Sequence, residues 1–230
     1  MARRPVYAKG IAKREEILQA ALAVVAAQGY RGASVRDIAD AAGLSPAGLL
    51  HYFGTKEELF VAILQARDEQ DARSHADADF MTAFLEIVGH NATVPGLVQL
   101  YAQLAAEAGD PAHPAHAFFQ ARKEWLDAPG REVIAAMQQA GKLRDDLDPA
   151  WIVRAAHALA DGLQNAWMLD PAVDMVADIE QFLALLRPPG APPRSASTRS
   201  SPTDAPAPGD QAPQTSGNWS ETPVFRPCPS

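Results

Sequence analysis

Apolar residues recur along most of the chain at a spacing that places them on one face of an α-helix. In the segment 13–28, for example, Ile17, Ala21 and Val25 share a face, because side chains four positions apart lie one above the other on a helix. No stretch of the sequence alternates apolar and polar residues for the length of a strand with the β-branched enrichment that strands show. The pattern therefore predicts an all-α protein.

Glycine, proline and capping residues divide the helical pattern into separate elements. Gly29 ends the first helix, and Asp148 with Pro149 starts a later one as its N-cap and first-turn residues. Pro129 is expected in the first turn of a helix of its own, since proline suits that position. Beyond residue 55 the predicted helices span residues 56 to the mid-70s, 80–89, 95–108, 115–127, 129–140, 148–169 and 173–187.

Two short helices are predicted between the first helix and residue 56. The first has a single buried stripe, made of Val35, Ile38, Ala39 and Ala42. Gly43 then allows a tight turn, and the second short helix, Pro46–Tyr52, follows the N-cap Ser45. A short helix, a glycine turn and a second short helix form a helix-turn-helix unit, although a helical hairpin inside a core would show the same pattern.

The segment 29–60, GYRGASVRDIADAAGLSPAGLLHYFGTKEELF, resembles the DNA-binding domain of TetR-family repressors. The specific markers are the pair Gly29-Tyr30, the run VRDIADAAGLS that begins at Val35, and the run HYFGTKEEL that begins at His51. The resemblance implies a three-helix helix-turn-helix domain in residues 1–55 and a helical ligand-binding and dimerisation domain in residues 56–187. The order of the later motifs GDPAHP, LRDDLDP and ADGL is similar to that of a BetI-like subgroup of these regulators.

The resemblance also implies which residues contact DNA. The second short helix would enter the major groove with its N-terminal residues against base edges, while Lys56 and Arg36 would reach phosphates. The implied set is Arg36, Ser45, Pro46, Ala47, Gly48, His51, Tyr52 and Lys56. Because the recognition helix contains no Lys or Arg, an arginine cannot read guanine from it. We expect backbone amides, thymine-methyl contacts and phosphate anchoring instead.

Charge is distributed unevenly along the sequence. Residues 1–56 carry eight Lys and Arg against four Asp and Glu, whereas residues 57–187 carry nine Lys and Arg against 21 Asp and Glu. A basic module on an acidic body indicates that only the N-terminus approaches a polyanion, although a solvated charged surface would give the same totals. The acidic body favours a cationic or neutral small-molecule ligand.

The middle and C-terminal helices are the candidates for sensing and dimerisation. In the family that the sequence resembles, the last two long helices pair with their symmetry mates, so a homodimer is expected. The candidate ligand-binding residues are Tyr101, Phe118, Trp125, His157, Asp161 and Asn165, although each of these also suits an ordinary core position. No metal or cofactor is expected. His113 and His116 flank Pro114 without supporting carboxylate or Cys ligands, so they are interpreted as surface histidines.

Together these observations favour a ligand-responsive transcriptional regulator, specifically a repressor that a small molecule releases from double-stranded operator DNA. A transcriptional activator would show the same features, because the position of the operator alone distinguishes the two. A small helical enzyme is disfavoured, since the chain has no nucleophile elbow, phosphate-binding glycine loop or zinc motif.

The remaining expectations concern location and the end of the chain. No apolar run approaches the ~18 residues that a membrane-spanning helix needs, so a cytoplasmic protein without membrane contact is expected. The Pro- and Ser-rich residues 188–230 cannot bury enough apolar area to offset their ordering entropy, and a disordered tail is predicted there.

Overall fold

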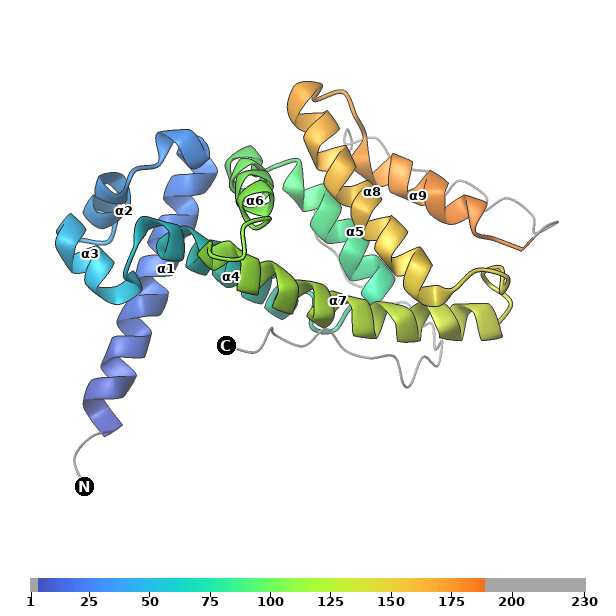
Figure 1. The fold of residues 1–230 in the computed structure, drawn as a ribbon, viewed down its shortest axis with the longest axis horizontal. Coiled ribbons are helices and arrows are strands. Elements are labelled where there is room, and N and C mark those ends of the chain that lie inside the picture. Colours follow the sequence, from blue (N-terminus) through green and yellow to red (C-terminus); the bar gives the residue numbers. More distant parts are fainter. Residues whose placement is uncertain (1–3, 189–230) are drawn as a thin grey trace, which may run out of the picture.

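The computed structural model describes residues 4–188, and every regular element in that range is a helix (Figure 1). The helices are α1 (Arg4–Gly32), α2 (Val35–Ala41), α3 (Pro46–Phe53), α4 (Lys56–Ser74), α5 (Phe80–Asn91), α6 (Pro95–Glu107), α7 (Pro114–Gln139), α8 (Pro149–Leu169) and α9 (Met175–Leu185). The predicted all-α fold is confirmed. The predicted disordered tail lies outside the described residues, apart from Pro188.

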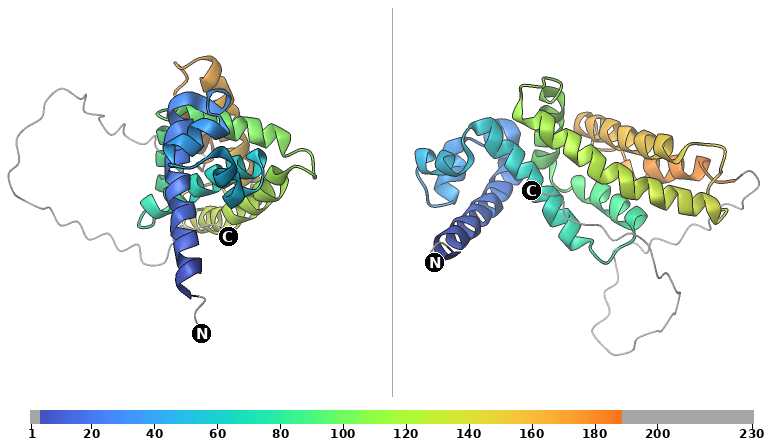
Figure 2. Two further views of the ribbon diagram at one scale, coloured as in Figure 1. Left: turned by 90° about the vertical axis from the view of Figure 1, so that its left-hand side faces the viewer. Right: turned by 60° about the horizontal axis from the view of Figure 1, so that its bottom comes forward.

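The helices form a small end and a larger body (Figure 1). Helices α1, α2 and α3 make up the small end, and α4 leads from them into the body formed by α5 to α9. Within the body α8 packs against both α7 and α9 (Figure 2). Helix α6 packs against α1 and therefore joins the body to the small end a second time, independently of the chain connection through α4.

Side-chain caps fix most of the helix starts, because an oxygen before the first turn accepts a backbone N–H that has no partner inside the helix. The capping residues are Ser34, Ser45, Thr55, Asp79, His113, Asp148 and Asp174. The cap at Asp174 explains why α9 begins at Met175, two residues later than the start predicted at Val173: its Oδ1 accepts the N–H of Ala177 at 2.9 Å.

Helix α1 differs from the prediction at its start and agrees with it at its end. It begins at Arg4 rather than near Lys13, in a stretch where the apolar stripe has not yet started. At Gly29 the backbone has φ 73° and ψ 168°, a conformation that favours glycine. The regular helix therefore ends before Gly29 as predicted, and one further helical turn continues to Gly32.

The predicted break between two helices at Pro129 is wrong, since α7 runs unbroken from Pro114 to Gln139. A proline inside a helix removes one hydrogen bond, so packing on both sides of it must hold the helix together. Gly130 supplies part of that packing: a Cβ there would lie 3.1 Å from Cγ1 of Val153 and 3.3 Å from Cζ of Phe80. The backbone of α7 thus lies directly against side chains of α8 and α5.

Apolar side chains form three clusters. The first joins α1, α2 and α3 to the start of α4 and to α6, and it includes the fully buried Leu59 and Ile63 of α4. The second and third lie in the body, around Ile152 of α8 and Ile179 of α9. The core of the small end therefore extends beyond residue 55 into the first turns of α4. The division into domains at residues 55 and 56 stays a prediction.

Two glycines lie where the small end and the body come into close contact. A Cβ on Gly96, in the first turn of α6, would lie 2.0 Å from the carbonyl oxygen of Val25 and 3.0 Å from Cα of Gly29. The first distance is shorter than real Cβ contacts and the second is tighter than most of them, so α6 can rest on the backbone of α1 only where position 96 has no side chain.

We predict that Gly96→Ala destabilises the protein by about 1–3 kcal/mol, because the added methyl group must push α6 away from the α1 backbone. Urea unfolding followed by circular dichroism measures the change. Gly10→Ala is the matched control: Gly10 also lies in a helix, but a Cβ there meets nothing within 4 Å. The control should match the wild type or exceed it by up to ~1 kcal/mol. Equal stability of the Gly96→Ala variant and the wild type would contradict the close packing.

Candidate nucleic-acid interface and interior cavity

The turn between α2 and α3 is fixed by local hydrogen bonds. Gly43 has φ 67°, which lets the chain reverse direction, and the N–H of Leu44 donates to the carbonyl of Ala39 at 2.8 Å. The hydroxyl of Ser45 then accepts the N–H of Gly48 at 3.1 Å. These contacts hold α3 at a set angle to α2, as a helix-turn-helix unit requires.

The capping box at the start of α2 is equally local. The Ser34 hydroxyl accepts the N–H of Asp37, and the Asp37 carboxylate accepts from both the N–H and the hydroxyl of Ser34. These hydrogen bonds hold the pKa of Asp37 below its ordinary value, so the carboxylate keeps its charge and its contacts at neutral pH.

Helix α3 buries one face and exposes the other. Leu49 is fully buried and Phe53 nearly so, and the guanidinium of Arg14 on α1 lies 5.0 Å from the Phe53 ring centroid. On the opposite face His51 and Tyr52 are exposed, with their rings edge to face at 6.2 Å. The core thus fixes α3 while leaving its outer face free to contact another molecule.

Lys56, the first residue of α4, is exposed next to this face. Its ammonium group lies 5.5 Å from the ring centroid of Phe60 and 6.0 Å from that of Tyr30, two rings that pack edge to face. Aromatic faces attract a cation and restrict where it points.

The structure leaves the residues implied for DNA contact at the surface of the small end. Only Gly48 is half-buried, and the exposed ones are Arg36, Ser45, Pro46, Ala47, His51, Tyr52 and Lys56. Figure 1 shows α2 and α3 at the outer edge of the molecule, away from the body. Their role in binding DNA stays a proposal.

A cavity of about 370 Å³ lies inside the body, bounded by α4, α5, α6, α7 and α8. Part of its lining is apolar and includes four aromatic residues, which we call the aromatic wall: Phe80, Phe84, Phe119 and Trp125. Charged residues of α4, α7 and α8 also line it. The volume falls in the range of pockets that bind small molecules.

The structure brings four of the six predicted ligand-binding residues to this cavity, namely Tyr101, Trp125, His157 and Asp161. Phe118 lies outside it and packs against the first apolar cluster, while its neighbour Phe119 lines the cavity. Asn165 is exposed and donates from Nδ2 to the backbone carbonyl of Asp161 at 2.9 Å. The placement of Phe118 and Asn165 therefore does not fit the hypothesis that they line the pocket.

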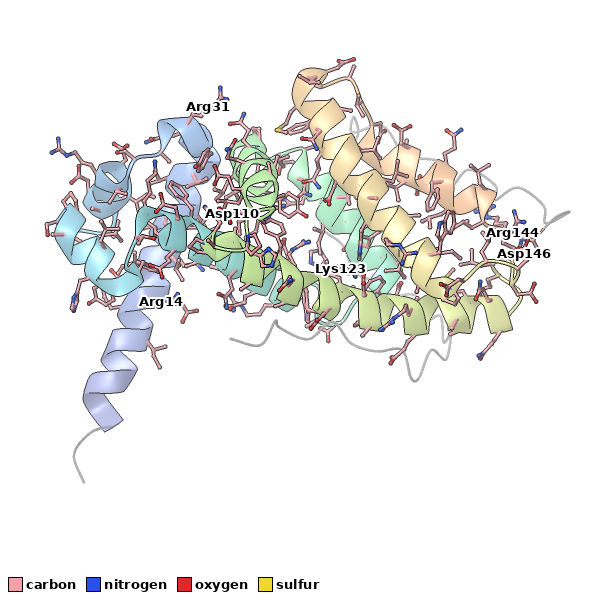
Figure 3. All side chains as sticks on the ribbon, in the orientation of Figure 1. Arg14, Arg31, Asp110, Lys123, Arg144 and Asp146 are labelled. Carbon is pink, nitrogen blue, oxygen red and sulfur yellow. The ribbon has the colours of Figure 1, made fainter. Side chains whose placement is uncertain are left out.

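Sequence reasoning missed an ion pair between two residues that line the cavity. Nε of Arg122 on α7 donates to Oδ2 of Asp68 on α4 at 2.8 Å, and the Arg122 guanidinium lies 5.2 Å from the ring centroid of Tyr101 on α6. Lys123, next in the sequence, pairs with Asp127 on the same helix. Figure 3 shows Lys123 on α7 in the middle of the molecule.

A second polar group, also missed, joins three helices. Arg67 of α4 donates to the side chain of Asn91 of α5, and Asn91 Nδ2 lies 3.4 Å from Oε1 of Gln164 of α8. All three residues are buried. The sequence contained a signal for one of them: Arg67 follows Ile63 by four positions, which places a charge on the apolar face of α4.

Burial sets the charge state of the titratable groups around the cavity. It raises the pKa of Tyr101 to about 12. It lowers the pKa of His157 to about 4, and the positive charge of Arg122 adds to that effect. Both groups are therefore neutral near pH 7. Burial also raises the pKa of Asp161, although the charge of Arg122 acts in the opposite direction.

The two histidines beside Pro114 serve the fold. Nδ1 of His113 accepts the N–H of Ala115 at 3.2 Å and caps α7, and Nδ1 of His116 lies 2.8 Å from the carbonyl oxygen of Ala108. Over residues 4–188 no three His, Cys, Asp or Glu side chains are grouped as a metal site would need. Over the same residues, none of the helices has the length and apolar character to cross a bilayer.

Comparison with known proteins identifies the small end. Residues 17–63 match the family model for bacterial regulatory proteins of the tetR family. The chain is 31% identical over 155 residues to the HTH-type transcriptional repressor KstR2 of Mycobacterium tuberculosis, a match that covers 62% of this chain and 74% of that protein. It is 28% identical over 168 residues to the HTH-type transcriptional regulator PksA of Bacillus subtilis, covering 69% of this chain and 80% of that protein.

Solved structures share the fold over most of the described residues. A TetR transcription regulator from Haloarcula marismortui superposes with a TM-score of 0.62 at 22% identity, covering 76% of this chain and 95% of that one. The regulator FadR from Bacillus subtilis, solved in complex with stearoyl-CoA, has a TM-score of 0.57 at 20% identity, covering 74% and 96%. The finer similarity to BetI-like regulators stays a prediction. The chain belongs to the TetR family and is a DNA-binding transcriptional regulator.

Proposed function

We propose that this regulator is a homodimeric repressor that binds operator DNA through two copies of α3 and leaves it when a small molecule enters the cavity. The observation that carries the proposal is the exposed start of α3 on a helix whose opposite face is anchored by Leu49 and Phe53. KstR2, with which this chain shares 31% identity, is named a transcriptional repressor. An activator would differ from this protein only in the position of its operator.

The surface chemistry of α3 supports a specific mode of DNA contact. Ser45, Pro46, Ala47 and Gly48 are small, so the start of the helix can come close to base edges in the major groove. His51 and Tyr52 supply hydrogen bonds and an aromatic surface, while Lys56 and Arg36 supply positive charge for phosphates. This division assigns affinity to the phosphate contacts and specificity to the start of α3.

A homodimer is supported by exposed apolar residues on the last two helices. Trp151 and Leu169 of α8 are 44% and 89% exposed, and Leu185 of α9 is 70% exposed. These residues lie on the two helices that pair with their symmetry mates in the family that the sequence resembles, so a second copy would cover them. A second copy also supplies the second recognition helix that a two-half-site operator requires.

Two helices connect the cavity to the DNA-binding surface. Helix α4 carries Lys56 at its start and contributes Arg67 and Asp68 to the cavity. Helix α6 contributes Tyr101 to the cavity and rests on α1 at Gly96. A ligand that binds one arrangement of these helices better than another would change the separation of the two copies of α3 and so weaken DNA binding.

We further propose that the chain has two domains: residues 1–55 bind DNA, and residues 56–187 bind the effector and dimerise. The protein would act by binding alone, without catalysis and without a cofactor. Because it binds operator DNA, the protein would work in the cytoplasm. FadR from Bacillus subtilis, which shares the fold, has been solved with stearoyl-CoA, so this fold can hold a small-molecule ligand.

We predict that Tyr52→Ala and Lys56→Ala each weaken binding to the promoter region upstream of the gene by about 1–3 kcal/mol, since each removes one contact with DNA. Fluorescence anisotropy with a labelled duplex measures the affinity, and gel filtration checks that the dimer persists. Lys56→Ala should also reduce the salt dependence of binding, by about one unit of slope.

The matched control for both variants is Arg131→Ala, which removes an exposed cation near the far end of α7. It should bind the same duplex like the wild type. Wild-type affinity in both Tyr52→Ala and Lys56→Ala would contradict the proposed surface, and loss of folding in both would place these residues in the core.

We predict that Ile87→Trp produces a repressor that still binds its operator but no longer responds to the effector. Ile87 lines the cavity and is half-buried, so a larger side chain there occupies ligand space. A reporter gene behind the native promoter, exposed to a panel of metabolites, measures derepression in cells with either protein. Equal derepression by the same metabolite in both would show that the effector binds elsewhere.

A further inference from the structure

We propose that the effector is an apolar carboxylate, with its carboxylate group on Arg122 and its body against the aromatic wall. The inference rests on the proposed function, because it names the ligand class of the same cavity.

Arg122 is one of the charged residues that line the cavity. Its positive charge acts on the pKa of groups from three other helices: Arg67 of α4, Tyr101 of α6, and His157 and Asp161 of α8. Its side chain is 23% exposed and lies over the ring of Tyr101. A ligand that fills the cavity therefore meets this guanidinium.

The described residues use only part of the hydrogen-bond donors of the Arg122 guanidinium. Among the residues that the structure describes, Arg122 makes one hydrogen bond, from Nε to Asp68 at 2.8 Å. Its amino groups Nη1 and Nη2 have no hydrogen-bond acceptor among those described residues. A planar pair of N–H donors fits the two oxygens of a carboxylate, and such charge-assisted bonds are stronger than neutral ones.

The carboxylates around the cavity are less available to a cationic ligand. Asp68 accepts from Arg122, Asp71 lies 3.8 Å from Nε of Arg67, and Asp127 pairs with Lys123. Asp161 faces the hydroxyl of Tyr101, which acts as its hydrogen-bond partner. A cation would therefore have to displace a partner that is already present.

One of the cations that line the cavity has no ion-pair partner among the residues that the structure describes. Arg154 lines the cavity from α8, one turn before His157, and makes no ion pair with any residue in 4–188. Its positive charge adds to the potential that an anionic group would meet on entering. The ligand charge inferred from these side chains is thus opposite to the one that the acidic composition of residues 57–187 suggested.

The rest of the cavity selects an apolar body. The aromatic wall is continued by Ile87, Val88 and Leu126, and these side chains bind flat or compact hydrocarbon groups. Since the volume of about 370 Å³ lies near the lower end of the range for small-molecule pockets, a bicyclic ring with a short acidic side chain is a suitable probe.

The test compares three probes with one naphthalene ring: 2-naphthylacetate, its neutral amide 2-naphthylacetamide, and the cationic 2-(2-naphthyl)ethylamine. Titration calorimetry on the full-length protein at pH 7.5 measures each affinity. We expect the carboxylate to bind at least about tenfold more tightly than either analogue, a difference of about 1.4 kcal/mol. Equal or tighter binding of the amide or the amine, or no detectable binding of the carboxylate, would overturn the proposal.

A variant series assigns the preference to Arg122. Arg122→Lys keeps a positive charge opposite Asp68 but removes the paired N–H donors, so the preference for the carboxylate should fall to about threefold or less. The double variant Asp68→Asn with Arg122→Gln keeps a neutral pair and should lose the preference altogether. The matched control is Arg144→Lys, since Arg144 is held by Asp146 outside the cavity, and this variant should keep the wild-type preference. An unchanged preference in both cavity variants would show that Arg122 does not bind the carboxylate.

Operator binding by the same samples separates this proposal from the function on which it rests. Full operator binding with no preference for the carboxylate would contradict the ligand class and leave the repressor function standing. Tight carboxylate binding with no operator binding at all would support the ligand class and contradict the repressor function.

Discussion

The structure depends on the direct contact between the backbones of α1 and α6 at Gly29 and Gly96. Because neither residue has a side chain, α6 lies so close to α1 that a single added carbon at Gly96 would overlap the carbonyl of Val25. The first apolar cluster extends the same contact to α4. A protein interior packed this closely transmits displacement, so in the proposed mechanism α6 as well as α4 connects the cavity to the DNA-binding end.

The buried charges around the cavity are paired, which limits the free energy that their burial costs. Arg122 and Asp68 offset each other, and Arg67 is held by Asn91 and Asp71, because an unpaired buried charge would destabilise the fold by several kcal/mol. These partners use only part of the donor capacity of Arg122. The same arrangement that keeps the interior stable therefore leaves N–H groups for a ligand in a cavity that the aromatic wall also lines.

Local chemistry explains how much of the fold could be predicted from the sequence. The caps at Ser34, Ser45 and Thr55 and the turn at Gly43 involve residues within a few positions of each other, so the pattern alone predicted both short helices and the start of α4. The continuity of α7 through Pro129 depends on packing of Gly130 against distant helices, which no local pattern contains.

The same contrast between local pattern and distant packing applies to the residues of the candidate sites. The resemblance to the TetR family implied the contact residues of α3 together, and burial of Leu49 on one face leaves most of them exposed. In the cavity, Phe118 was predicted and Arg122 was not, because periodicity does not show which side of α7 faces α4 and α8. The partners Asp68 and Arg122 lie 54 positions apart, and only the folded chain brings them together.

The central claim is that two copies of α3 contact one duplex in successive major grooves. Hydroxyl-radical footprinting of the upstream promoter with the full-length protein tests it most directly. The proposed dimer predicts two protected segments related by a two-fold axis, with their centres about one helical turn, roughly 10 base pairs, or a multiple of that distance apart. A single unsymmetrical segment, or no protection at low ionic strength, would contradict it.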